Sequence, residues 1–356
     1  MKLLQNQQLL QLLETETSKF GEKQQLWIER YLYIYTLILT RQINNHLGAP
    51  IHYRIEKGKL NISGSKDYTR IFNFFKQHNI ISVSRERRVR TSCRRYTVQT
   101  YFQQGKVVES KVLELKNEHQ DYGDLLNKYF QYLNEITVEL PEINDISEVQ
   151  EVILNRIQNK DHYIAQPHED SRIYTLICNL KKENRQYLRW NNNTLNQVDI
   201  SASQIVIAIG LYNKQYGELP KDVQELLNIC KNGNIYSTLN CTKEEFYKNI
   251  WYNKAKYMNN ELSNTFKELF PSLWNFIYSI KVKHGNKKLA MLLQKYEYQV
   301  ISKSIEYLYN KNIPCISLHD SIIFPDINKS GVIKMVMENT FNNIFGIKIG
   351  LKISKF

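Results

Sequence analysis

One thirteen-residue segment, Ile313–Pro325, constrains the fold of this chain more than any other. Two apolar runs rich in β-forming residues, Cys315–Leu318 and Ile322–Phe324, flank a short polar tip that contains His319 and Asp320. Apolar runs on both sides of so short a tip predict a tight β-hairpin. In such a hairpin the Asp320 carboxylate lies at a strand end, where it can contact a metal ion.

A second aspartate has a similar setting about 120 residues upstream. The segment Asn196–Ser203 predicts a strand that contains Asp199, and Ser203–Tyr212 predicts an apolar helix directly after it. Two aspartates on adjacent strand ends suit a two-metal phosphoryl-transfer site, in which the metals lie about 3.5–4 Å apart. Each motif alone is also typical of ordinary structure, because aspartate commonly caps helices and turns.

The composition indicates a globular protein without a disulfide framework or a zinc site. Hydrophobic residues make up 42% of the chain, and the five cysteines are scattered without a CxxC pair. The first residues lack the features of a signal peptide. The most apolar early segment, Trp27–Ile43, contains Glu29, Arg30 and Arg41, which predicts a core helix and not a membrane span. We therefore expect a cytoplasmic protein. Whether a phage, a plasmid or an organelle encodes it stays open.

Charge is distributed unevenly along the first half of the chain. Residues 41–101 contain 13 Lys or Arg against 3 acidic residues, whereas residues 106–165 contain 6 against 12. A basic module next to an acidic one predicts a localised polyanion-binding surface.

The basic module has the element order of a winged helix. Lys66–Ile80 predicts a helix, Ile80–Val83 a strand, and a return strand begins near Tyr96. Guanidinium groups on the hairpin between the strands suit contacts with nucleic-acid phosphates, DNA or RNA. The alternative is a solvated basic hairpin without a ligand. The six arginines of this hairpin are Arg85, Arg87, Arg88, Arg90, Arg94 and Arg95.

Residues 169–325 contain several motifs in an order that resembles family A DNA polymerases and the related single-subunit phage-type RNA polymerases. The segment VDISASQ around Asp199 is similar to their motif A, and LHDSIIF around Asp320 is similar to motif C. The resemblance implies two Mg²⁺ ions, with Mn²⁺ as a substitute, bound by both aspartates and by the Ile200 carbonyl. It also implies that His319 contacts the 3′ end of the primer.

Two further elements of the resemblance concern nucleic acid. The segment DSRIYTLICNLKKENRQYL resembles the family's T-x-G-R-type element, which implies that Arg172 contacts the minor groove of the primer–template. Arg185 or Arg189 would then hold a template or primer phosphate, and Gln294 matches a glutamine that packs beside the primer–template. The alternative for each arginine is a surface ion pair.

The choice of sugar stays open from the sequence. Gln204 lies where the family's DNA polymerases have a glutamate that excludes the ribose 2′-OH. The D-x-S-x-S spacing after Asp199 and the serine at Ser321 are closer to the RNA polymerases.

The triphosphate site is expected in the fingers. The element NGNIY at 232–236 precedes a stretch rich in lysine and aromatic residues, which lacks the family's motif spacing. The resemblance implies that Lys256, or failing that Lys254, binds the triphosphate with Tyr252 beside the nucleotide. A solvated helix face is the alternative.

We therefore expect an α+β fold in three parts. Residues 1–106 form a helical, winged-helix-like nucleic-acid-binding module, 107–167 a helical thumb-like segment, and 168–356 a polymerase palm with an antiparallel sheet and helical fingers. The implied function is template-directed extension of a 3′-OH by nucleoside triphosphates with release of pyrophosphate, slightly favouring DNA synthesis without proofreading. The alternatives are a reduced phage-type RNA polymerase or primase-like enzyme, a terminal transferase or protein-primed enzyme, and a non-catalytic winged-helix replication initiator or DNA-binding protein.

Overall fold

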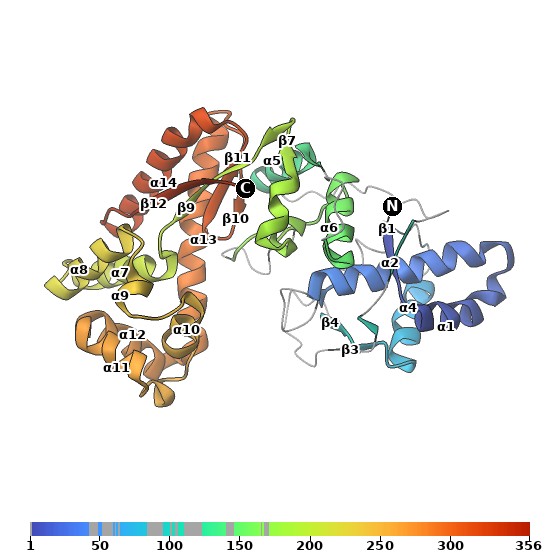
Figure 1. Cartoon of the computed structure of the whole chain (residues 1–356), viewed down its shortest axis with the longest axis horizontal. Helices are drawn as coiled ribbons and strands as arrows, with labels where there is room; N and C mark the ends of the chain where they lie inside the picture. Colours follow the sequence, from blue (N-terminus) through green and yellow to red (C-terminus); the bar gives the residue numbers. More distant parts are fainter. Residues whose placement is uncertain are drawn as a thin grey trace. The chain divides into compact units, whose positions relative to one another are not determined.

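Helices and short antiparallel sheets alternate in both halves of the computed structural model (Figure 1). The chain forms two compact units: unit 1 contains Met1–Ala165 and Tyr174–Asn192, and unit 2 contains Gln166–Ile173 and Asn193–Phe356. This confirms the predicted α+β class, whereas the winged-helix, thumb, palm and fingers assignments are finer and stay predictions. The structure describes residues 2–42, 49–51, 60, 62, 65–83, 95–99, 102–103, 106–109, 123–139, 146–164, 166 and 171–356.

A long helix, α2 (Gln24–Gln42), forms the centre of unit 1. It packs against α1, β1, β4 and α6, and nearly every side chain from Trp27 to Arg41 is buried. This confirms the predicted core helix. The other main elements of unit 1 are β1 (Lys2–Gln5), α1 (Gln7–Thr17), β2 (Ala49–Pro50), α4 (Ser65–Gln77), β3 (Ile81–Val83), β4 (Arg95–Val98), β5 (Lys106–Glu109), α5 (Asp124–Glu135), β6 (Ile136–Val138), α6 (Glu148–Gln158) and β7 (Leu188–Trp190).

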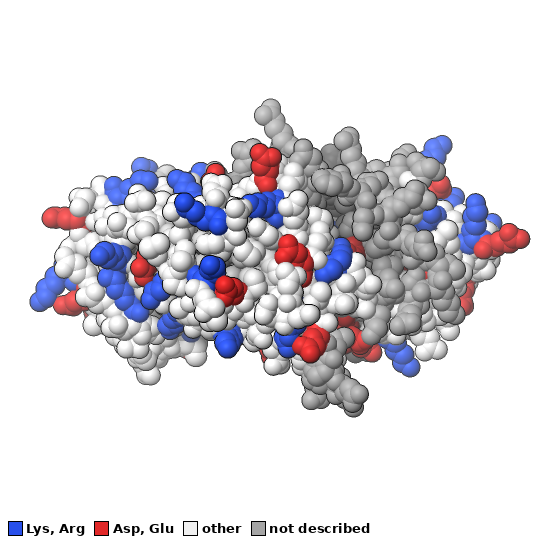
Figure 2. All heavy atoms as spheres, turned by 90° about the horizontal axis from the view of Figure 1, so that it is seen from above, with Lys and Arg blue, Asp and Glu red and all other residues white. Residues whose placement is uncertain are grey.

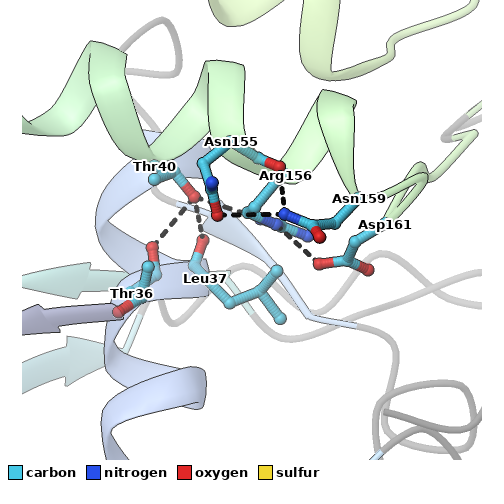
Figure 3. Close-up of polar contacts among 7 residues, drawn as sticks. All are labelled: Thr36, Leu37, Thr40, Asn155, Arg156, Asn159 and Asp161. Atoms are coloured by element: carbon cyan, nitrogen blue, oxygen red, sulfur yellow. Dashed lines mark hydrogen bonds and ion pairs between the residues drawn. The ribbon is translucent and has the colours of Figure 1, made fainter. Parts of the chain in front are cut away.

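Polar groups inside unit 1 are paired where α2 meets α6 (Figure 3). Arg156 Nε donates to Asp161 Oδ2 at 2.7 Å, and its Nη1 donates to Thr40 Oγ1 at 3.3 Å. Thr40 Oγ1 in turn donates to the Thr36 carbonyl at 2.9 Å. A buried charge is tolerated only with such partners, because burial removes its hydration. This network therefore fixes the packing of α6 on α2.

Helix α4 and strands β3 and β4 form the described part of the predicted winged-helix module. Strands β3 and β4 are antiparallel with Ile81 opposite Val98, and β2 pairs with the other edge of β4. The arginine-rich hairpin, with Arg85, Arg87, Arg88, Arg90 and Arg94, lies outside the described residues, and of Arg95 only the backbone in β4 is described.

Two stretches predicted as helical contain strands. Lys2–Gln5 forms β1 instead of a helix. Helix α1 begins only at Gln7, because the Asn6 side chain caps it by accepting hydrogen bonds from the amides of Gln8 and Leu9. Strand β1 pairs with β5, with Leu3 opposite Val108, and β6 directly follows α5. Local apolar spacing could not reveal the β1–β5 pairing, because it joins segments about 100 residues apart.

A four-stranded antiparallel sheet in the order β10-β11-β9-β12 forms the frame of unit 2. Helix α13 packs against β10 and β11, and α14 packs against β9 and β12. The two helices also contact each other and α7. The main elements are β9 (Asn196–Ile200), α7 (Ser203–Tyr216), α8 (Lys221–Lys231), α9 (Ile235–Thr238), α10 (Lys243–Phe246), the π-helical turn η5 (Tyr247–Trp251), η6 (Ala255–Tyr257), α11 (Glu261–Leu269), α12 (Pro271–His284), α13 (Asn286–Asn310), β10 (Ile316–Leu318), β11 (Ser321–Phe324), α14 (Ser330–Phe345) and β12 (Leu351–Lys355).

Lysines give unit 2 its positive charge. Residues 193–356 contain 20 Lys, no Arg and 13 acidic residues, and both signs lie on the face that Figure 2 shows. Among the described residues no helix is long and apolar enough to cross a membrane.

Candidate active site

Strand register brings Asp199 and Asp320 together on adjacent strands of unit 2. Asp199 lies opposite Ser321, and the Ile200 amide donates to the Asp320 carbonyl at 3.3 Å. Val198 and Ile200 are buried, while Asp199 is half-buried, because side chains alternate between the two faces of a strand. The two carboxylates predicted as a pair therefore meet at one sheet end.

A left-handed residue directly precedes Asp320, and another follows Asp199 by three positions. The tip of the predicted hairpin is two residues long, and its first residue, His319, has φ 57°. Ala202, which lies between β9 and α7, has φ 50° and ψ 45°. Residues with a Cβ adopt this region at a cost of about 1 kcal/mol, and such positions concentrate at functional sites.

The two carboxylates repel each other electrostatically. Burial and the charge of Asp320 raise the pKa of Asp199 from 3.8 to about 7. The charges of Lys243 and Lys352 lower it in part, and Lys352 lies opposite Asp199 in the sheet. The pair thus has an excess of negative potential that a cation would neutralise.

A third carboxylate, Glu297 of α13, lies close to the pair but is already engaged. Arg172 Nε is 2.5 Å from Glu297 Oε1, and Arg172 Nη2 is 2.7 Å from Oε2. Ser203 Oγ is 3.5 Å from Oε2. The Glu297 side chain is 0% exposed and that of Arg172 17%. Burial raises the pKa of Glu297, while Arg172 lowers it.

Two tyrosines, Tyr247 and Tyr252, form an aromatic wall beside the carboxylates of the site. Burial, followed by the charges of Asp320 and Glu297 among other groups, raises the pKa of Tyr247. Gln204, the second residue of α7, is 4% exposed and lies beside the Tyr252 hydroxyl, whose pKa it lowers by hydrogen bonding. Burial acts the other way and raises the pKa of Tyr252 overall. Gln204 therefore links the start of α7 to the residue that follows η5.

The predicted triphosphate lysines are both exposed. Lys254 and Lys256 lie beyond η5, and Lys256 Nζ lies 4.7 Å from the centre of the Tyr257 ring. The charge of Lys243 acts on Asp199 instead, and Lys243 Nζ lies 5.8 Å from the centre of the Tyr247 ring.

The predicted nucleic-acid residues divide between the units. Gln294 lies half-buried on α13, one turn before Glu297. Arg185 and Arg189 belong to unit 1, where Arg185 Nη2 donates to the Leu180 carbonyl at 3.2 Å and Arg189 Nε donates to Glu139 at 2.7 Å. Within the described chain both arginines thus have protein partners.

Sequence reasoning missed Lys243, Tyr247 and Glu297. A spacing signal existed for the first two, because Lys243, Tyr247 and Trp251 recur every four residues and so combine a lysine with two aromatic residues at helical spacing. The π-helical turn at Tyr247–Trp251 then shifts the following residue, Tyr252, into the position beside Gln204. No sequence signal identified Glu297, because only the fold brings it to Arg172.

The donor set fits a hard divalent cation. Asp199 and Asp320 provide carboxylate oxygens, and Mg²⁺ commonly takes one or two carboxylates and completes its shell with water and substrate phosphates. Among the described residues there is no group of three or more His, Cys, Asp or Glu that could hold a metal.

The raised pKa of Asp199 predicts a pH-dependent response to Mg²⁺. Between about pH 4 and pH 7 the folded metal-free protein holds a proton that the unfolded chain has released, so this group's contribution to stability falls as pH rises. A cation needs the ionised carboxylate and offsets the repulsion. We expect Mg²⁺ to raise the Tm more at pH 8 than at pH 6, measured by thermal unfolding with Mg²⁺ or EDTA. An equal rise in Asp199→Asn would contradict this.

Comparison with known proteins gives little further information: no family model and no curated protein matches the chain. Among solved structures, the POL domain of Pol1 from M. smegmatis, in complex with DNA primer-template and dNTP, is similar at a TM-score of 0.34 and 10% identity. The similarity covers 58% of this chain and 49% of that chain, so the chain spans about half of that domain. At this level of similarity the functional assignment depends on the site itself.

Proposed function

We propose that this protein is a template-directed nucleotidyltransferase, which extends a 3′-OH with nucleoside triphosphates and releases pyrophosphate. This proposal rests on Asp199 and Asp320, which lie on adjacent antiparallel strands. Burial and the charge of Asp320 raise the pKa of Asp199. Two hard carboxylates beside an aromatic wall and a lysine suit a nucleoside triphosphate better than a purely structural role.

Each group near the pair has a role in this proposal. Asp199 and Asp320, with the Ile200 carbonyl, would hold two Mg²⁺ ions. Bound there, the ions would activate the attacking hydroxyl and stabilise charge on the phosphate oxygens. The charge of Lys243 acts on Asp199, beside which the triphosphate would bind. Lys243 would therefore screen the β and γ phosphates. His319, at the hairpin tip, would contact the primer end.

Unit 1 would hold the nucleic acid. Helix α4 and strands β3 and β4 have the order that a winged helix needs, and the arginines of the hairpin would contact phosphates. Residues 107–167 would act as the thumb-like segment. A non-catalytic DNA-binding protein would need only this part, so it would bind nucleic acid without incorporating nucleotides.

The decisive experiment is primer extension with dNTPs or NTPs on primed DNA and RNA templates, with and without Mg²⁺. Metal-dependent and template-dependent incorporation is the expected result. Incorporation without a template would indicate a terminal transferase, and label attached to the protein itself would indicate protein priming. Nucleic-acid binding without incorporation on any template would refute the proposal.

Gln204 should control the choice of sugar. Its side chain is buried and lies beside the Tyr252 hydroxyl. Among the described residues, Gln204 Oε1 has no hydrogen-bond partner within normal distance and angle limits. We therefore expect it to crowd a ribose 2′-OH, so that Gln204→Ala raises the ribonucleotide to deoxyribonucleotide ratio of kcat/KM by about 10–200-fold. Steady-state kinetics with matched dNTP and NTP pairs measure this ratio.

A matched variant separates crowding from loss of packing. Gln204→Met keeps the approximate side-chain size without adding charge and should leave the ratio near the wild-type value. If wild-type protein already accepts ribonucleotides and Gln204→Ala leaves the ratio unmoved, the gate assignment is wrong. The reduced phage-type RNA polymerase, which Ser321 and the D-x-S-x-S spacing favour, then becomes the better assignment.

A further inference from the structure

Unit 2 has a basic and aromatic surface that the proposed site does not use. It lies where the loop after η5 meets the corner between α12 and α13, and we call it the corner surface. Its side chains are all exposed, and none contributes to the aspartate site described above. They are Lys254, Lys256, Tyr257, Lys283, Lys287 and Lys288.

Hydrogen bonds hold the two parts of the corner surface together. Asn286 Nδ2, at the start of α13, donates to the Tyr252 carbonyl at 2.9 Å. Lys281 Nζ, in the last turn of α12, donates to the Ile250 carbonyl and to the Asn253 carbonyl, the latter at 3.0 Å. The loop that carries Lys254 is therefore fixed beside the α12–α13 corner.

Lys281 is a buried structural cation in this arrangement. Its side chain is 3% exposed, and burial lowers its pKa from 10.5 to about 8. Its ammonium group lies among backbone carbonyls and 3.3 Å from Met258 Sδ. Such a group orders the loop before any ligand arrives, which reduces the entropy lost on binding.

The charge of the corner surface is mostly uncompensated. Between Lys254 and Lys288 the sequence has seven lysines and two acidic residues, Glu261 and Glu268. The first backbone amides of α13 add partial positive charge, because the N-terminus of a long helix favours anions. A polyanion is the ligand that this distribution fits best.

An exposed aromatic ring decides which polyanion fits. Tyr257, the aromatic residue of the corner surface, is 56% exposed. Lys256 Nζ lies over the Tyr257 ring, so cation and ring form one platform. Unpaired bases stack on exposed rings, whereas bases in a duplex already stack on each other. Lysines alone would bind both forms of nucleic acid, but a ring beside them favours a single strand.

We propose that the corner surface binds single-stranded nucleic acid. Its lysines contact backbone phosphates, and Tyr257 stacks on a base. The strand is the unpaired part of the template, and only this identification rests on the proposed function. The binding itself requires neither the aspartate pair nor a nucleotide.

The first test is equilibrium binding of a labelled oligo(dT) of about 12 nucleotides to the full chain over a range of salt concentrations. Wild type is compared with K254Q/K256Q/K283Q/K287Q and with a control that changes four exposed lysines elsewhere in unit 2. The slope of log K against log salt should flatten by up to about 0.7 per lost contact, and the control should match wild type. Equal slopes in test and control variants would overturn the proposal. The control lysines are Lys221, Lys303, Lys311 and Lys329.

The second test addresses stacking. Tyr257→Ala should weaken oligo(dT) binding by about 5–150-fold, while Tyr257→Phe retains it and binding of a duplex of equal length is unchanged. An equal loss for duplex and single strand would overturn the assignment to single strands. Primer extension separates this proposal from the enzymatic one. If the wild-type protein incorporates no nucleotide, the enzymatic proposal fails and the binding result still stands. If the lysine and Tyr257 variants extend primers and bind oligo(dT) like wild type, only the corner-surface proposal fails.

Discussion

Replacement of either aspartate by asparagine should reduce nucleotide incorporation by at least about 10³-fold while the fold is retained. Asn removes one carboxylate charge from a pair that would hold two divalent cations, and so withdraws charge stabilisation that the transition state needs. The effect should be similar for Asp199→Asn and Asp320→Asn, because the ligands act as one unit. Single-turnover primer extension at saturating Mg²⁺ measures it.

In the absence of metal, the same variants should be at least as stable as the wild type. Asp320 raises the pKa of Asp199, so neutralising either group relieves repulsion in the folded state. Thermal unfolding in EDTA at pH 8 should therefore show an equal or higher Tm. A variant that loses activity because it unfolds would show a lower one.

Asp326 provides the matched control. It is exposed, lies six residues after Asp320, and accepts a hydrogen bond from the Asn328 amide as a cap, which asparagine can also do. Asp326→Asn should keep wild-type incorporation. Near wild-type turnover in Asp199→Asn or Asp320→Asn would refute the two-metal assignment, whatever the control shows.

The hairpin could be predicted from sequence because its signal is local. Apolar runs on both sides of His319 and Asp320 give a strand–turn–strand pattern within a few residues, and the structure has β10 and β11 there. The α7 helix after Asp199 is equally local, since its apolar residues are continuous from Ile205 to Leu211. Strand pairing of β9 with β11 could be expected only from the resemblance between motifs.

The missed residues depend on geometry that no local pattern contains. The charge of Lys243, at the start of α10, acts on Asp199, whereas Lys256 lies beyond the π-helical turn and is exposed. A π-turn adds one residue to a helix, so residue spacing counted with a regular period fails after it. Glu297 is 125 residues from Arg172 in sequence, and only the packed fold pairs them.

The Arg172–Glu297 pair is the other position where a single change should have a large effect. The pair connects the segment before β9 to α13, and Ser203 of α7 contacts the same carboxylate. Arg172→Met should reduce the free energy of unfolding by about 3 kcal/mol, because it leaves a buried carboxylate without its counter-charge. This estimate is at the low end of the usual range, since the Arg172 side chain is 17% exposed.

The pH dependence distinguishes loss of the charge pair from loss of packing. Without Arg172, which lowers the pKa of Glu297, that pKa should rise further above its ordinary value of 4.5. The folded variant then binds a proton that the unfolded chain has released, so its stability falls as pH rises above about 4.5. We expect the loss relative to wild type to be smaller at pH 5 than at pH 8, measured by urea unfolding. A loss independent of pH would indicate packing alone.

The double variant Arg172→Met/Glu297→Leu completes the cycle. Replacing both members by apolar side chains of similar size removes the buried charge together with its partner, and such replacements are often neutral or stabilising. The double variant should therefore recover most of the stability that Arg172→Met loses. If its activity recovers as well, the pair serves to hold the segment before β9 against α13. If stability recovers and primer binding does not, Arg172 contacts nucleic acid directly, as the sequence motif predicts. Additive losses in the two single variants would show that the pair is not coupled and contradict the prediction.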